Sequence, residues 1–188
     1  MTIDAFLKKY NIPGISGIDT RALTRRLRTA GVMKGLITTS TEPDEALIER
    51  VKELPDLSGN DFVKTASTKE IYTVGDGDWH VVLMDFGAKL NIQRCLLKYG
   101  CRVTVVPCDT TGETILKMKP DGVMLSNGPG DPKDIPYAVE SVKELIGKVP
   151  IFGICLGHQI LALALGGDTY KLKFGHRGGN HPVKELTS

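Results

Sequence analysis

Residues 80–106 read HVVLMDFGAKLNIQRCLLKYGCRVTVV, and this stretch decides the fold. It contains an apolar run at residues 80–86, a helical pattern at residues 90–99 and a second apolar run at residues 103–106. A short apolar run bounded by turn residues is typical of a strand that is buried on both faces. The sequence therefore predicts a strand, a helix and a second strand, the unit from which parallel sheets are built.

The same alternation continues further along the chain. We expect a helix at about residues 114–118, a strand at 123–125, a helix at 137–146 and a strand at 151–154. Strands that alternate with amphipathic helices predict an α/β domain with a doubly wound, mostly parallel sheet, which we place at residues 71–188. Ligands of such sheets bind at the carboxyl ends of the strands, so the loops after the expected strands are the first places to search for a site.

Residues 1–70 differ in composition, and we expect them to form part of a smaller α+β domain with a linker. Asp19 is positioned to cap a helix that continues through residue 27. A β-prone run at residues 36–39 precedes a second expected helix at about residues 43–54. This zone carries no recognisable catalytic pattern.

The composition excludes several classes of protein. The 188 residues contain 24 Lys and Arg against 22 Asp and Glu, a formal net charge of +2, and 41% hydrophobic residues. This balance is typical of a globular chain and gives no electrostatic reason to expect nucleic-acid or membrane binding. No apolar run approaches the roughly 18 residues that span a bilayer, and four irregularly spaced cysteines favour reduced thiols. We therefore expect a cytoplasmic protein.

Two loops at the expected carboxyl edge carry the chemistry. Residues 126–132, SNGPGDP, follow one expected strand, and residues 153–159, GICLGHQ, follow another. In the second loop Cys155 lies between Gly153 and Gly157, which is the spacing of a nucleophile elbow with sulfur in place of oxygen. The N–H groups at the start of the following helix would stabilise a thiolate and an oxyanion there. Taken alone, the pattern also fits a small buried cysteine at the end of a strand.

Together the two loops resemble the class I, or triad, glutamine amidotransferases. Three further segments are similar to the family of small, glutamine-hydrolysing subunits of carbamoyl phosphate synthetase: IDTR at 18–21, DFGAKLNI at 85–92 and KFGHRGGNHPV at 173–183. The resemblance covers essentially the whole chain. Other amidotransferases of the class share the cysteine elbow but not the last of these segments.

The resemblance implies roles for individual residues. Cys155 matches the nucleophile that attacks the side-chain amide of L-glutamine, releases ammonia and leaves a glutamyl thioester for water to cleave. The family's glutamine-contacting positions match Gly128, Gly130, Leu156 and Gln159, with Gly128 and Leu156 as donors of oxyanion N–H groups. The ammonia would pass to the large subunit of carbamoyl phosphate synthetase, which uses bicarbonate, ATP and magnesium. The resemblance therefore implies no metal and no cofactor in this chain.

The sequence departs from the family at the general base. The family's histidine and glutamate lie in a His-Pro-Glu motif far downstream of the cysteine. The sequence through Ser188 does not contain this motif. His181 and Pro182 precede Val183 and belong to the segment quoted above, so they do not replace that motif. We also expect a front portion of the first domain to be missing, and we expect this polypeptide alone to be weakly active or inactive. The alternative is a module that binds glutamine and docks on a synthetase partner without hydrolysing glutamine.

Histidines near the cysteine leave one further alternative open. His158 lies three residues after Cys155, and His176 and His181 follow later in the chain, so these residues could form a zinc site with sulfur and nitrogen ligands. The elbow already accounts for the cysteine. We expect His158 to pack or hydrogen-bond beneath the elbow.

Overall fold

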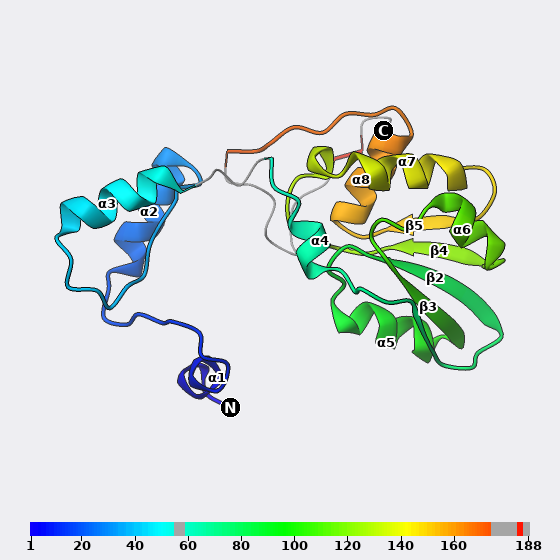
Figure 1. The fold of residues 1–188 in the computed structure, drawn as a ribbon, viewed down its shortest axis with the longest axis horizontal. Coiled ribbons are helices and arrows are strands. Elements are labelled where there is room, and N and C mark those ends of the chain that lie inside the picture. Colours follow the sequence, from blue (N-terminus) through cyan, green and yellow to red (C-terminus); the bar gives the residue numbers. More distant parts are fainter. Residues whose placement is uncertain (55–58, 174–183, 186–188) are drawn as a thin grey trace. The chain divides into compact units, whose positions relative to one another are not determined.

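The structure, a computed structural model, describes residues 1–54, 59–173 and 184–185. The chain divides into two compact units, Met1–Pro55 with Tyr170–Ser188, and Asp56–Thr169 (Figure 1). The domain boundary between residues 70 and 71 that the sequence suggests stays a prediction. Among the described residues, no helix is both long enough and apolar enough to cross a membrane.

The described residues of the first unit form the helices α1 (Ile3–Lys9), α2 (Thr20–Ala30) and α3 (Asp44–Glu53). Helix α2 begins as expected, because the Asp19 carboxylate accepts the N–H of Ala22 at 2.9 Å. Helix α3 confirms the second expected helix, whereas α1 is not predicted. The strand expected at residues 36–39 is wrong: these residues form no strand, because the described part of this unit offers no neighbouring strand to pair with.

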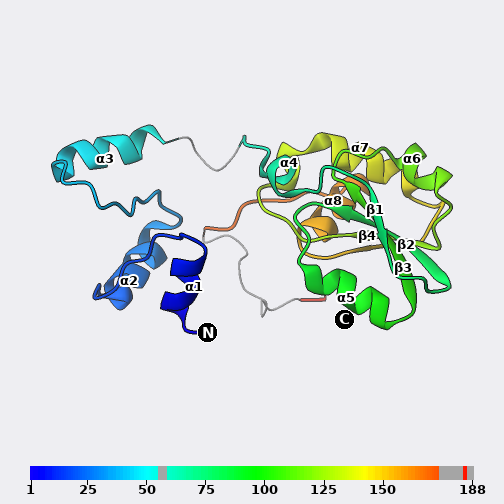
Figure 2. The same ribbon diagram turned by 60° about the horizontal axis from the view of Figure 1, so that its bottom comes forward.

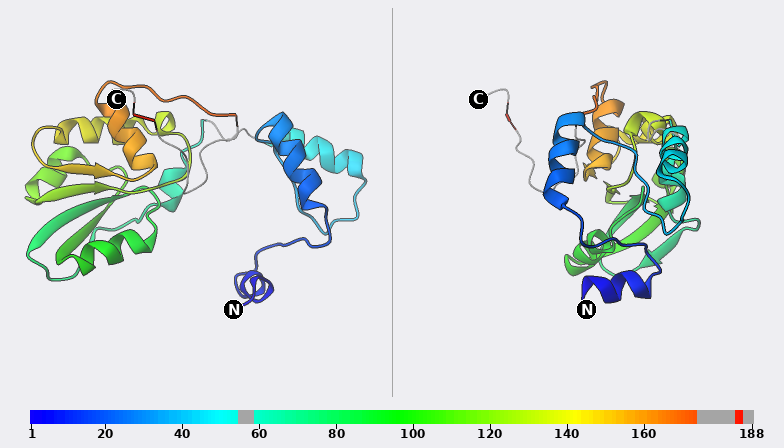
Figure 3. Two further views of the ribbon diagram at one scale, coloured as in Figure 1. Left: turned by 180° about the vertical axis from the view of Figure 1, so that it is seen from behind. Right: turned by 90° about the vertical axis from the view of Figure 1, so that its left-hand side faces the viewer.

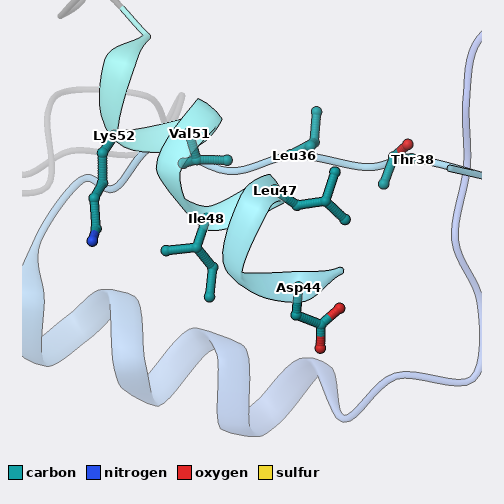
Figure 4. Close-up of a pocket in the computed structure, with 7 residues that line it drawn as sticks. All are labelled: Leu36, Thr38, Asp44, Leu47, Ile48, Val51 and Lys52. Carbon is teal, nitrogen blue, oxygen red and sulfur yellow. The ribbon is translucent and has the colours of Figure 1, made fainter. Parts of the chain in front are cut away.

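A mostly apolar hollow of about 430 Å³ lies beside α3 in the first unit. Figure 4 shows side chains of the helix and of the extended segment near Leu36 around it. Its lining comprises Leu36, Thr38, Asp44, Leu47, Ile48, Val51 and Lys52. This set contains none of the cysteine and glycine positions that the sequence identifies, so we place the candidate chemistry elsewhere.

The described residues of the second unit contain a five-stranded sheet in the order β1–β3–β2–β4–β5. The strands are β1 (Tyr72–Val74), β2 (Trp79–Asp85), β3 (Cys101–Pro107), β4 (Gly122–Leu125) and β5 (Ile151–Gly153). Strand β1 pairs antiparallel with β3, and all other neighbours are parallel; Leu83 on the central strand lies opposite Val105 and Met124. The doubly wound, mostly parallel sheet expected from the sequence is confirmed.

Helices cover both faces of this sheet (Figures 1 and 3). Helix α5 (Leu90–Lys98) packs on the face that presents Leu83, and α6 (Gly112–Lys117), α7 (Pro136–Leu145) and α8 (Leu156–Ala164) pack on the face that presents Val82 and Met84. Side chains of one strand alternate between the faces, so the apolar run of β2 supplies both cores. Helices α5, α6 and α7 confirm the expected ones to within two residues at either end, and α8 confirms the helix expected directly after the cysteine.

Three short elements of the second unit are not predicted by the sequence. They are β1 at the sheet edge, α4 (Phe62–Ala66) and the 3-10 turn η1 (Pro132–Asp134). Helix α4 begins at the side-chain cap Asp61, and its Val63 is buried in the same core as α7 and α8. Residues 62–66, which the sequence assigns to the first domain and its linker, therefore pack on the α/β fold.

The strand order places the topological switch point between β2 and β4. After β2 the chain crosses one face of the sheet to β3, and after β3 it crosses the other face to β4. The loops that follow β2 and β4 therefore diverge, which leaves space for a ligand at their carboxyl ends. Strand β5 pairs with β4 in parallel, so the loop after β5 opens at the same edge.

Candidate active site

Cys155 lies in a tight turn between β5 and α8. Its backbone has φ +53° and ψ −106°, a sparsely populated conformation with positive φ that costs a residue other than glycine about 1–3 kcal/mol. The side chain is exposed. A strained residue that presents its side chain between a strand and a helix has the geometry of a nucleophile elbow. An exposed thiol does not fit the alternative of a small buried cysteine.

Gly153 and Gly157 allow helix α8 to approach the sheet closely. A Cβ atom on Gly157 would lie 2.6 Å from the Cβ of Leu125, and one on Gly153 would lie 2.6 Å from the backbone nitrogen of His158. Both distances are too short for real side chains, so only glycine fits at these two positions. The G-x-C-x-G spacing in the sequence thus follows from the packing of the elbow against β4 and against its own helix.

Ser126 ties the loop after β4 to both neighbouring elements. Its hydroxyl accepts the N–H of Phe86 at 2.9 Å and donates to the carbonyl of Asn127 at 2.8 Å. Its N–H donates to the carbonyl of Met84 at 3.2 Å, and its carbonyl accepts the N–H of Gly157 at 3.0 Å. The residue is fully buried. Ser126 therefore joins the ends of β2 and β4 to the start of α8.

The loop after β2 is fixed by Asp85 and Asn127. The buried Asp85 carboxylate accepts the N–H groups of Gly87 and Ala88 at 2.9 and 2.7 Å. The Asn127 side chain accepts the N–H of Lys89 at 3.0 Å and donates to the carbonyl of Gly87 at 3.2 Å. The loops after β2 and β4 are consequently joined by hydrogen bonds. Their relative position is set by these side-chain bonds as well as by the sheet.

Three of the residues identified in the sequence come together at this edge: Cys155, Leu156 and Gly128. A Cβ on Gly128 would lie 2.7 Å from Cδ2 of Leu156 and would overlap the carbonyl of Phe86. Leu156 is buried and begins α8, directly after the cysteine. Only a residue without a side chain can bring the β4 loop this close to the elbow.

The other two residues identified in the sequence lie further from this contact. Gln159 is half-buried one turn into α8, and its N–H donates to the carbonyl of Cys155 at 3.1 Å. Gly130 is exposed, has φ +86°, and lies beside α4: a Cβ there would be 3.7 Å from Cδ2 of Phe62 and 4.0 Å from the carbonyl oxygen of Asn60. The structure thus places Gly130 against an element that the sequence does not predict.

Several backbone N–H groups around the elbow and the β4 loop have no acceptor within the described part of the chain, and those of Gly128 and Leu156 are among them. The N–H groups of the first turn of any helix lack intrahelical partners. Unpaired donors next to a nucleophile are what an oxyanion site requires. The arrangement therefore offers a thiol and two donors for a negatively charged oxygen.

The structure contradicts the expectation for His158, which is exposed rather than packed or hydrogen-bonded beneath the elbow. Leu156 and Ile160 occupy the buried stripe of α8, and residue 158 falls off that stripe. Among the described residues, no group of three or more His, Cys, Asp and Glu side chains is placed to hold a metal ion. His176 and His181, which the zinc alternative also uses, lie outside the described residues.

Ser126 and Asp85 are part of the site but are not singled out by the sequence. Each stands at the carboxyl end of a strand of the switch point, Asp85 as the last residue of β2 and Ser126 as the first residue after β4. A small polar residue that ends an apolar run is the signal that could have identified both, because its side chain can reach the backbone of the following loop.

Residues 82–188 match the family model of the class-I glutamine amidotransferases. The chain belongs to this family. Residues 1–37 of the chain match a second model, described as the CPSase domain of the carbamoyl-phosphate synthase small chain. The two matches lie on either side of the stretch that contains α3, α4 and β1.

Relatives resemble this chain over essentially its whole length. A carbamoyl phosphate synthase small chain from Methanopyrus kandleri is 53% identical over 191 residues, which cover 99% of this chain and 53% of that protein. A pyrimidine-specific small chain of the same synthase from Bacillus subtilis is 54% identical over 187 residues, which cover 100% of this chain and 51% of that protein. The chain thus spans about half the length of the curated relatives that it matches.

Proposed function

We propose that this chain supplies the glutamine-hydrolysing part of a carbamoyl phosphate synthetase small subunit. Its substrate would be L-glutamine, and the ammonia would pass to a large synthetase subunit that makes carbamoyl phosphate from bicarbonate and ATP. The observation that carries the proposal is the exposed Cys155 with its positive φ, followed by Leu156, against which the glycine loop packs at Gly128; the N–H groups of both residues have no acceptor within the described residues. Membership of the amidotransferase family and the names of the relatives support the same substrate and partner.

The chemistry would proceed in two steps. The Cys155 sulfur attacks the carbonyl carbon of the glutamine side-chain amide, the carbon–nitrogen bond breaks, and ammonia leaves with the proton that the thiol gives up. The product is a thioester between Cys155 and the γ-carboxyl group of glutamate. Water then cleaves the thioester, which returns the thiol and releases glutamate. No oxidant, reductant or cofactor is consumed in either step.

The oxyanion that forms during each step would be held by the N–H groups of Gly128 and Leu156. Removal of one such donor typically lowers the rate about 100- to 1,000-fold. These donors belong to the backbone, so the residues that fix the two loops are as important as the nucleophile. Ser126 is central in this respect, because it hydrogen-bonds to both loops and to α8.

We assign no general base. Of the two histidines among the described residues, His80 is buried in the first half of β2 and hydrogen-bonded to Thr104 at 2.9 Å, at the amino end of the sheet. His158 is exposed in α8. The ATP and magnesium of the synthesis belong, in this proposal, to the large subunit.

A rapid acid quench after mixing the chain with L-glutamine tests the proposal. We expect mass spectrometry to find a glutamyl adduct on the peptide that contains Cys155, sensitive to hydroxylamine and missing from Cys155→Ala. Asparagine, one methylene shorter, serves as the control substrate. If no adduct formed but glutamine still slowed alkylation of the Cys155 thiol, the result would favour instead a module that binds glutamine and does not hydrolyse it.

A further inference from the structure

The segment from Gly59 to Thr68 runs along the carboxyl edge of the sheet and touches both loops of the candidate site. At one end, Phe62 lies 3.7 Å from the position that a Cβ would take on Gly130. Further along, Ala66 lies 3.1 Å from the corresponding position on Gly87. At the other end, the N–H of Thr68 donates to the Asp85 carboxylate at 2.7 Å. The segment therefore borders the loops after β2 and β4.

Asp61 anchors this segment through both oxygens of its carboxylate. One oxygen accepts the N–H of Lys64 at 3.0 Å and caps α4, and the other accepts the hydroxyl of Tyr137 at 2.9 Å. The Lys64 ammonium lies 5.1 Å from the centre of the Tyr137 ring. Figure 2 shows α4 next to α7, the helix that carries this tyrosine. Tyr137 thus links the start of α4 to α7, in addition to the burial of Val63 and the hydrogen bond from the Gly59 N–H to the Asp134 carboxylate at 3.1 Å.

The surroundings of the Tyr137 hydroxyl favour its protonated form, which can donate a hydrogen bond. It is partly buried, and Cys108 lies 3.6 Å away from its oxygen. Burial, followed by the hydrogen bonds with Cys108 and Asp61, raises the pKa of Tyr137 far above its ordinary value. The hydrogen bond to Asp61 consequently persists throughout the neutral and mildly alkaline range. The elbow itself is held by other bonds, from the N–H groups of Ile154 and Gly157 to residues of the β4 end.

We propose that Asp61 and Tyr137 are positioning residues for glutamine: their hydrogen bond keeps the segment 60–62 beside Gly130 and so fixes the glycine loop in the conformation that binds substrate. This inference rests on the proposed function, because it assigns a purpose to a contact of the glutamine site. Loss of the bond loosens the contact between the segment 60–62 and Gly130, while the buried Val63 keeps α4 on the core and the elbow stays in place. Glutamine affinity should therefore fall while the intrinsic reactivity of Cys155 is retained.

Alkylation of Cys155 by iodoacetamide in the full chain measures the two properties separately. The rate without glutamine reports the reactivity of the thiol, and the glutamine concentration that halves the rate reports affinity. For Tyr137→Phe we expect this concentration to rise about threefold to tenfold, the effect of one hydrogen bond, with the rate in the absence of glutamine within about twofold of wild type. Asp61→Asn should have a smaller effect than Asp61→Ala, because an amide oxygen can still accept one bond.

Ser141→Ala is the matched control. Its hydroxyl donates to the Tyr137 carbonyl at 3.0 Å within α7 but does not contact the segment 59–68. We expect this variant to bind glutamine like the wild type, even if both variants lose some thermal stability. The inference alone would be overturned if glutamine protected Cys155 equally well in the wild type and in Tyr137→Phe. It would also be overturned if Tyr137→Phe changed the alkylation rate without glutamine as much as it changed the half-protecting concentration. Absence of protection in the wild type would overturn the proposed function, and the inference with it.

Discussion

The N–H of Gly157 donates to the carbonyl of Ser126 at 3.0 Å, which joins the first turn of α8 to the loop after β4. The hydroxyl of the same serine accepts the N–H of Phe86 from the loop after β2. One buried residue therefore links the three loops at the switch point of the sheet by hydrogen bonds. A site whose oxyanion donors are backbone groups depends on such fixed loops more than on the chemistry of its side chains.

Substitution of Gly157 tests the close packing of the elbow. In Gly157→Ala the added Cβ would overlap the carbonyl of Leu125, so we expect the free energy of unfolding to fall by about 1–3 kcal/mol. Chemical denaturation measures this. Gly122→Ala is the control, because its Cβ would lie 3.7 Å from the nearest atom, the Pro150 oxygen. Equal stability of the two variants would contradict the packing described for α8.

Loss of the Ser126 hydroxyl should destabilise the protein through an unsatisfied group. Ser126→Ala leaves the buried N–H of Phe86 without its acceptor, which costs about 1–3 kcal/mol. We also expect weaker protection of Cys155 by glutamine, since the loop after β4 loses its link to β2. Denaturation curves and thiol alkylation check the two effects. If Ser126→Ala had the stability and the glutamine protection of the wild type, Ser126 would have no role in holding the site together.

The backbone strain at Cys155 predicts an unusual order of stability. Glycine adopts a positive φ without strain, so Cys155→Gly should be more stable than Cys155→Ala by about 1 kcal/mol. The same pair at Cys95, inside α5, should show the opposite order, because glycine weakens a helix by about 0.5–1 kcal/mol relative to alanine. Thermal denaturation of the four variants distinguishes them. An alanine variant as stable as the glycine variant at residue 155 would argue against a strained elbow.

The raised pKa of Tyr137 predicts a loss of stability at high pH. The folded state keeps the tyrosine proton where the unfolded chain, with an ordinary pKa of about 10, has released it. The unfolded state then binds fewer protons, so the free energy of unfolding falls as the pH rises above about 10. Tyr137→Phe lacks this contribution. We expect the stability advantage of wild type over Tyr137→Phe to be constant from about pH 7 to 9 and to shrink above pH 10; a constant advantage would contradict the shift.

The sequence predicts those parts of the fold that depend on local pattern. The apolar runs of β2 to β5 and the helices between them are long enough or regular enough to be recognised, and Asp19 caps α2 as expected. The short elements β1 and α4 are stable only because they pack on the sheet, and their residues carry little signal alone. The run at residues 36–39 carries a strand signal and finds no partner in the described residues.

For the site, the sequence identifies the residues that need a special backbone and misses those that act through contacts. The glycines on both sides of Cys155 are visible as a motif because no other residue fits there. Ser126, Asp61 and Tyr137 are ordinary residue types whose importance arises from hydrogen bonds between segments far apart in the chain. The placement of His158 depends on which stripe of α8 faces the core, and Leu156 and Ile160 decide that stripe.

The central claim is that Cys155 is a nucleophile in a glutamine pocket, and selective labelling tests it most directly. The chain would be treated briefly with a chloroketone analogue of L-glutamine, with and without excess glutamine, and the modified peptides identified by mass spectrometry. Cys95 is also exposed and serves as an internal control. We expect rapid labelling of Cys155 alone, suppressed by glutamine and lost in Cys155→Ala. Equal labelling of Cys155 and Cys95, unaffected by glutamine, would contradict the account.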